Sequence, residues 1–236
     1  MFSKTASLRC CKSRKLSKKT VTMVTLLVAV LIYIGANLVD VDGYTGNKFW
    51  RPVTPCFKSK QHTARLIELA HKTHLVLESM GVDHWLMYGS LWGPLRGIPG
   101  PLPWDHDVDI GIDGNGNFKK IPLEKFKAKF KAAGLGLIDK LQESTYLSVK
   151  GYGESVGLFL YYNYRGTMMR SGYESWLFYI HYRFRHSFPA KLLQHPLPKV
   201  KFGSFNISVP RGGIEIMKHL YPTNWWKVVK PKSCKD

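Results

Sequence analysis

WDHDVDIGI, residues 104–112, alternates polar and aliphatic side chains from His106 onward. Alternation with a period of two is typical of a β-strand that is buried on one face. We therefore predict a strand over His106 to Ile112. Its aliphatic residues would face the core, and Asp107 and Asp109 would share the opposite face.

Three carboxylates, those of Asp105, Asp107 and Asp109, stand at alternate positions in this stretch. Like charges on one strand face repel and raise each other's pKa, and a divalent cation relieves that cost. Oxygen ligands favour Mg²⁺, Mn²⁺ or Ca²⁺, and a metal held by two carboxylates commonly also binds substrate phosphates. An EF-hand is excluded, because Ile110 stands where its loop starting at Asp105 requires glycine. We predict that Asp107 and Asp109 are metal ligands, with Asp105 beside them.

The segment before this stretch has features of a phosphate-binding turn. Residues 85–88 read as a short apolar strand that ends at Gly89 and Ser90. Glycine allows close approach of a phosphate, and serine offers a hydroxyl and a backbone N–H. Arg96 follows closely enough to add a guanidinium fork.

The rest of the chain alternates helical and strand patterns, without internal repeats, which is an α+β pattern. Leu66, Leu69, Ala70 and Leu77 fall on one helical face before a glycine. The other expected elements are a basic helix over 122–133, strands over 146–150 and 156–164, a hairpin of 200–202 with 205–209, and a short helix over 214–221.

Composition and charge narrow the class of protein. Apolar residues make up 44% of the 236, enough to form a core. The net charge is +19, and residues 1–20 carry seven of the 35 basic residues and no acid. A basic surplus on a folded domain suits nucleic acid, anionic lipid or phosphorylated substrates, and charge alone does not choose among them.

Residues 21–39 run 19 positions without a charge, about the length of a membrane-spanning helix. A cleaved signal peptide is the alternative, but its apolar part is usually shorter. Because the flanking positive charge is N-terminal, we predict a signal anchor of a single-pass type II membrane protein whose C-terminal domain is lumenal. We assign it to the Golgi membrane, and the sequence leaves the endoplasmic reticulum open as the alternative. The expected parts are a cytosolic tail (1–20), the anchor (21–39), a stem (40–60) and one lumenal domain (61–236). Nucleic acid is then not an expected partner.

Cysteine and sequon positions fit a lumenal domain. Cys56 and Cys234 flank it, and an oxidising lumen would allow a disulfide between them, although spacing does not exclude two free thiols. Asn206-Ile207-Ser208 matches the N-glycosylation sequon. Its place in a strand-like stretch argues against full occupancy.

The run YGSLWGPLRG (88–97), followed by PWDHDVDIGI (103–112), resembles the LicD/fukutin family, which includes the fukutin-related proteins. In that family G-T/S-L-L-G-x-x-R precedes W-D-x-D-x-D. The run FNISVP (205–210) and HLYPTNW (219–225) are similar to the family's C-terminal motif. The resemblance covers about residues 85–226.

This resemblance implies a nucleotidyltransferase-like mixed sheet with flanking helices. Its members transfer a phospho-group, such as phosphocholine or ribitol phosphate, from a CDP-linked donor to a glycan. It implies that Asp107 and Asp109 hold Mg²⁺ or Mn²⁺ and that Asp105 is their catalytic neighbour. It further implies a donor site formed by Gly89, Ser90, Arg96 and Trp104.

One departure from the family pattern bears on activity. A V-D-I-F-like segment supplies a third carboxylate in such folds, and here Gly157 stands at that place in VGLF (156–159). Glu154 is three residues earlier, so strand parity turns it to the other face unless a bulge intervenes. The alternative to a phosphotransferase is therefore a catalytically inactive module that binds a nucleotide or glycan.

Overall fold

The computed structural model describes residues 17–39, 56–141, 145–172, 186–222, 224–228 and 230. The chain separates into an N-terminal unit, Met1–Gly43, and a larger unit, Tyr44–Asp236. In the first unit, helix α1 (Lys18–Val39) covers the predicted anchor. Among the described residues, no helix is both long enough and apolar enough to cross a membrane. The Golgi location stays a prediction, as does the stem, of which residues 40–55 lie outside the described part.

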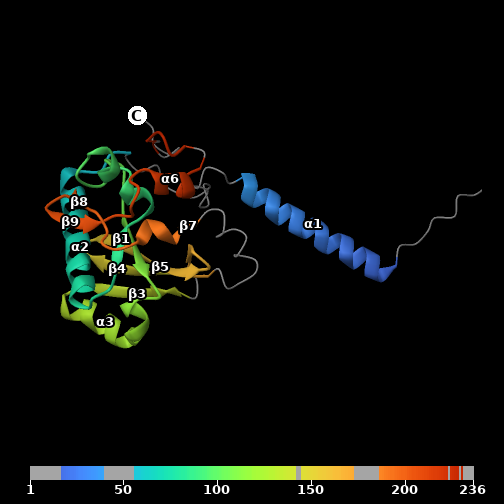
Figure 1. The fold of residues 1–236 in the computed structure, drawn as a ribbon, viewed down its shortest axis with the longest axis horizontal. Coiled ribbons are helices and arrows are strands. Elements are labelled where there is room, and N and C mark those ends of the chain that lie inside the picture. Colours follow the sequence, from blue (N-terminus) through green and yellow to red (C-terminus); the bar gives the residue numbers. More distant parts are fainter. Residues whose placement is uncertain are drawn as a thin grey trace, which may run out of the picture. The chain divides into compact units, whose positions relative to one another are not determined.

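The larger unit is built on a seven-stranded mixed sheet (Figure 1). Its strands are β1 (His84–Leu86), β2 (Val108–Asp113), β3 (Gly136–Lys140), β4 (Tyr146–Gly151), β5 (Glu154–Tyr164), β6 (Thr167–Arg170) and β7 (Ser187–Pro189). The main order is β1-β2-β5-β4-β3, with β6 pairing β5 and β7 pairing β6. Only β2 and β5 are parallel among these described pairs.

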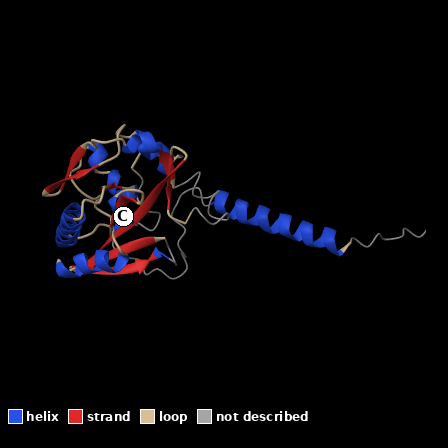
Figure 2. Cartoon of the chain, turned by 60° about the horizontal axis from the view of Figure 1, so that its bottom comes forward, coloured by secondary structure: helices blue, strands red, loops and turns tan. Residues whose placement is uncertain are grey.

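Helices flank the sheet of this unit (Figure 2). They are α2 (Lys60–Ser79), α3 (Leu123–Ala132) and α6 (Glu215–Leu220), with 3₁₀ turns η1 (Tyr88–Leu91), η2 (Pro94–Arg96), η3 (Asn117–Lys120) and η4 (Ala190–Leu193). A separate hairpin consists of β8 (Lys199–Phe202) and β9 (Phe205–Ser208). The α+β class with a mixed sheet and flanking helices is thus confirmed.

Helix α2 has the predicted buried face and ends. Leu66, Leu69 and Leu77 are fully buried, and the helix packs on β5. The Ser59 hydroxyl accepts the His62 backbone N–H, which satisfies one free donor of the first turn. After the last turn Gly81 adopts a φ of +62°, a left-handed conformation that glycine takes without strain.

The aliphatic residues of β2 face the core, as the alternation in this strand predicted, and the opposite face of the sheet also buries Trp85 and Tyr161. Val108, Ile110 and Ile112 have no exposed surface. Asp109 lies on the opposite face and is only partly buried. Three strands were not predicted: β3, β6 and β7 are at most five residues long, and their pairing with β4, β5 and each other decides them more than any local alternation.

Candidate active site

The backbone of Asp109 is held by the segment that follows β1. The Met87 N–H donates to the Asp109 carbonyl at 2.9 Å. The Asp109 N–H donates to the Ser90 hydroxyl oxygen, also at 2.9 Å. Strand β1 ends at Leu86, and the 3₁₀ turn η1 carries Ser90, whose hydroxyl accepts the Asp109 N–H. The position of the Asp109 carboxylate therefore depends on this turn.

The prediction of three carboxylates on one strand is wrong for Asp105 and Asp107, because β2 begins at Val108. Asp105 instead closes a turn: its Oδ2 accepts the Leu102 N–H at 2.7 Å, and its N–H donates to the Leu102 carbonyl at 2.9 Å. The proline-rich loop before β2 forms this turn. The same residues could not form it if they were extended and paired in the sheet. Asp107 lies between the turn and the strand, and its Oδ2 is 3.8 Å from Nε2 of His106.

Burial and mutual repulsion perturb this group of carboxylates. Burial raises the pKa of Asp109 well above its usual value, and the Asp107 charge adds to the rise, whereas the Arg170 guanidinium acts in the opposite direction. Burial also raises the pKa of Asp105 to about 7, against the hydrogen bond from Leu102. Perturbed carboxylates gathered at one place are typical of functional sites.

Asp107 and Asp109 are the two carboxylates that the sequence predicts as ligands of a divalent cation. The raised pKa of Asp109 reflects first the free-energy cost of burying its charge and then the neighbouring Asp107 charge, and a bound cation would lower that cost. Within the described residues, no group of three or more His, Cys, Asp or Glu side chains could hold a metal. Two carboxylate ligands match Mg²⁺, which usually completes its shell with water and substrate phosphates.

The place of the expected third carboxylate is occupied by Gly157. Gly157 is the register partner of Asp109 in the parallel pair β2–β5. A Cβ built on Gly157 would come within 3.1 Å of Asp109 Oδ1 and 2.8 Å of the Phe159 ring. Glu154 lies on the other face of β5, as strand parity predicted, with its side chain 5% exposed.

A hydroxyl cluster that the sequence did not indicate lies beside Asp109. The Tyr161 hydroxyl donates to the Tyr88 hydroxyl at 2.7 Å, and Tyr88 Oη is 3.0 Å from His186 Nδ1. Arg170 lies over the Phe159 ring, 4.5 Å from its centroid. Tyr88 has a φ of +46°, a left-handed backbone conformation that is costly for a non-glycine residue.

Charge coupling ties this cluster to the carboxylates. Burial raises the pKa of Tyr161 and of Tyr221, and in both the Asp109 carboxylate adds to the rise. Tyr88 comes from η1, Tyr161 from β5 and Arg170 from β6. His186 precedes β7, and Tyr221 follows α6. The signal in the sequence is weak, since only the alternation of aromatic residues in β5 hints at them.

The predicted donor-binding residues have different surroundings. Gly89 has open space where a Cβ would be, so no neighbouring protein atom requires a glycine there. Ser90 is buried and holds Asp109. Arg96 stacks on Trp92 at 4.4 Å and donates from Nη2 to the Trp225 carbonyl at 2.8 Å, which joins η2 to the C-terminal segment. Trp104 meets Phe57 edge to face, with centroids 6.4 Å apart.

The sequence predicts two covalent modifications, a disulfide of Cys56 and an N-glycan on Asn206. Cys56 is disulfide-bonded, and Cys234, the partner proposed from the sequence, lies outside the described residues. Asn206 is an exposed residue of β9, opposite Lys201. Its glycosylation stays a prediction.

Comparison with known proteins gives one family. Residues 81–212 match the family model described as LicD/FKTN/FKRP, nucleotidyltransferase domain. Ribitol 5-phosphate transferase FKRP of Homo sapiens is 30% identical over 182 residues, which cover 75% of this chain and 33% of FKRP. The Mus musculus protein of the same name is 30% identical over 177 residues, covering 72% and 32%. The chain thus spans about a third of the length of these relatives.

Among solved structures, the antibiotic-resistance factor ANT(2'')-Ia in solution is similar, with a TM-score of 0.33 and 12% identity. The match covers 45% of this chain and 52% of that one. At this level the likeness adds nothing about ligands.

Proposed function

Because this chain belongs to the LicD/FKTN/FKRP family, we propose that it is a metal-dependent phosphotransferase that uses a CDP-activated donor and a glycan acceptor. The similarity to ribitol 5-phosphate transferase FKRP supports a phosphotransferase. The observation that carries the proposal is the carboxylate of Asp109, whose backbone is held by Ser90 and whose pKa is raised by burial and by the charges of Asp107 and Asp105.

Each residue has a role in this proposal. Asp107 and Asp109 would hold Mg²⁺ or Mn²⁺, which would bind the donor diphosphate and offset the charge on the departing CMP. An acceptor hydroxyl attacks the phosphorus distal to the cytidine, and the bond from that phosphorus to the oxygen of CMP breaks. The pKa of Asp105, about 7, suits it to take the hydroxyl proton. Phosphocholine or ribitol phosphate would be the transferred group.

The titration of nucleotide into the protein tests the donor site. CDP is added to the purified chain of residues 1–236, with and without Mn²⁺. Wild type and Asp113→Ala, a control on the same strand, should bind CDP only when Mn²⁺ is present. The double variant Asp107→Ala/Asp109→Ala should not bind. An absence of binding in wild type would remove the basis of the donor site.

A catalytically inactive nucleotide- or glycan-binding module is the second candidate. The observation that favours it is the register of Gly157 with Asp109, which leaves the third carboxylate position empty of charge. Release of CMP from CDP-choline or CDP-ribitol in the presence of glycan acceptors separates the two candidates. Binding without CMP release from any donor would favour the inactive module.

We also propose that the larger unit resides in the Golgi lumen. Its support is the disulfide of Cys56, because disulfides persist in oxidising compartments. Glycosidase treatment of the expressed chain tests this: a mass shift that Asn206→Gln abolishes would support a lumenal domain. Full protease sensitivity of the domain in sealed microsomes would contradict it.

A further inference from the structure

Glu154 is a carboxylate on the core face of β5. It lies on the same face as Val156 and Leu158, which have no exposed surface. Burying a charge costs several kcal/mol unless partners compensate it. Two side chains of α2 do so, and they bond different oxygens of the carboxylate.

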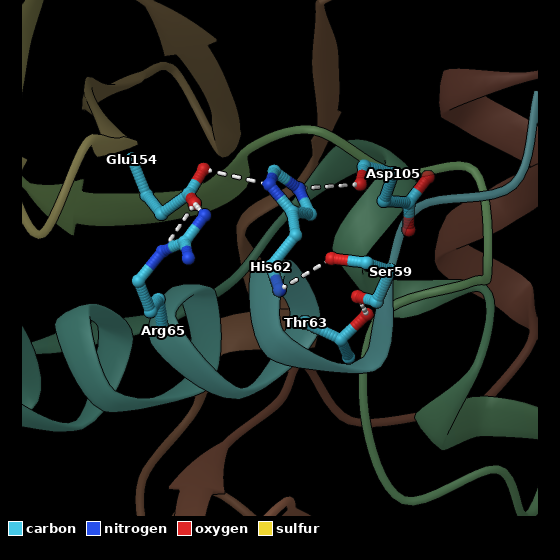
Figure 3. Close-up of polar contacts among 6 residues, drawn as sticks. All are labelled: Ser59, His62, Thr63, Arg65, Asp105 and Glu154. Atoms are coloured by element: carbon cyan, nitrogen blue, oxygen red, sulfur yellow. Dashed lines mark hydrogen bonds and ion pairs between the residues drawn. The ribbon is translucent and has the colours of Figure 1, made fainter. Parts of the chain in front are cut away.

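The two partners of Glu154 divide its oxygens (Figure 3). Arg65 donates from Nε and Nη2 to Oε1, at 3.0 and 2.7 Å. His62 Nδ1 lies 2.9 Å from Oε2. Arg65 by itself would already join α2 to β5. The contact between Glu154 Oε2 and His62 Nδ1 additionally fixes the orientation of the His62 ring.

The other nitrogen of that ring reaches the candidate active site. His62 Nε2 lies 3.3 Å from the backbone carbonyl oxygen of Asp105 (Figure 3). Both ring nitrogens therefore face oxygen atoms that can accept a hydrogen bond. The start of α2 is itself fixed, since Ser59 Oγ accepts the His62 N–H at 3.1 Å.

Neighbouring residues support the same contact. The Lys58 N–H donates to the Pro103 carbonyl at 2.8 Å. Phe57 lies against Trp104, and Cys56 is held by its disulfide. The segment 56–62 thus lines the loop 103–105 from which the chain continues to the two carboxylates. It lies outside residues 81–212, which match the family model.

We propose that His62, oriented by Glu154, is a positioning residue for the carboxylate loop. By fixing the Asp105 carbonyl it limits the directions in which Asp105 and Asp107 can point. The inference rests on the proposed function, because its consequence is a metal and donor site that is held in place before the ligands bind. Residues that orient a metal site typically change metal affinity about 10- to 100-fold when they are replaced.

Two substitutions at the same position separate the bonds of the ring. In His62→Gln the amide can take the place of Nε2 and donate to Asp105. In His62→Asn it takes the place of Nδ1 and donates only to Glu154. Arg65→Lys is the control, because it weakens the bonds to Oε1 and leaves the His62 contacts in place. All are made in the chain of residues 1–236.

Two measurements decide the outcome. Hydrogen exchange of the backbone amides of Leu102 and of residues 104–107 is followed without metal, and Mn²⁺ affinity is measured by titration. His62→Asn should speed exchange and weaken Mn²⁺ binding about 10-fold, while His62→Gln and Arg65→Lys should stay close to wild type in both.

The inference is overturned if exchange in His62→Asn equals that of wild type, or if His62→Gln is impaired as much as His62→Asn. Faster exchange with unchanged Mn²⁺ affinity would also overturn it, because the contact would then only stabilise the loop. Absence of Mn²⁺ binding in wild type overturns the proposed function instead. The exchange comparison without metal distinguishes that failure from a failure of the inference.

Discussion

Gly157 and Asp109 are register partners in the parallel pair β2–β5, and a Cβ on Gly157 would lie 3.1 Å from Asp109 Oδ1. A side chain on Gly157 would therefore point at the carboxylate that the proposed metal site requires. The space there is limited by the Phe159 ring, which would have to move. This relationship makes Gly157 the position at which the metal site can be changed most directly.

Replacement of Gly157 by Asp should strengthen Mn²⁺ binding, because it adds a carboxylate beside Asp109. Without metal the variant should be less stable than Gly157→Asn, its uncharged counterpart of equal size, since a third negative charge is added. Crowding should cost both variants about 1–3 kcal/mol of unfolding free energy. Titration with Mn²⁺ and urea unfolding in EDTA measure the two effects. Equal Mn²⁺ affinity in both variants would contradict the prediction.

The pKa of Asp105, raised to about 7, predicts a pH dependence of stability in metal-free protein. Between its ordinary value of 3.8 and about 7, the folded chain binds more protons at this group than the unfolded chain does. The resulting stability is present at acid pH and lost as pH rises through about 7. Asp105→Asn, which keeps an acceptor for the Leu102 N–H, should reduce this loss. Urea unfolding midpoints from pH 4 to 8 in EDTA test this prediction. The same dependence of the midpoint on pH in Asp105→Asn as in wild type would refute it.

The buried pair His74 and His84 should have the opposite pH dependence. His74 Nδ1 and His84 Nε2 are 2.7 Å apart. Burial, with the neighbouring His84, lowers the pKa of His74 to about 4, and burial lowers that of His84. Because folding lowers the pKa of both histidines, the stability that depends on their neutral forms is present above about pH 6.5 and is lost as the pH falls toward 4.

His74→Gln should therefore make the chain less sensitive to acid. Comparing urea midpoints at pH 7 and pH 5 measures this, and an Asp105→Asn background removes the opposing slope. A variant as acid-sensitive as its parent would show that the pair does not stay neutral in the folded chain.

Arg96 should contribute to stability through Trp92 and the Trp225 carbonyl. Its replacement by Ala should cost about 1–3 kcal/mol of unfolding free energy, from a lost cation–π contact and a lost hydrogen bond to a charged donor. Arg96→Lys keeps the charge but loses the planar stacking, so its cost should be intermediate. Urea unfolding measures the loss. Full stability with weakened CDP binding would instead favour the donor role inferred from the sequence.

Local patterns were enough to predict elements whose residues bury one face. The helix of Leu66 and Leu77, the aliphatic face of β2 and the β8–β9 hairpin have strong periodicity or turn signals, and the structure confirms them. The short strands β3, β6 and β7 have no such signal, because pairing with distant strands stabilises them.

The sequence by itself determined the family, the α+β class and the group of aspartates, because these depend on residue types at fixed spacings. A local turn between Leu102 and Asp105 precedes β2, which begins at Val108. Tertiary structure decided that Gly157 faces Asp109 and that Glu154 holds His62 toward the loop. These contacts join residues about 40 to 90 positions apart, and chain separation of that size leaves no local pattern to read.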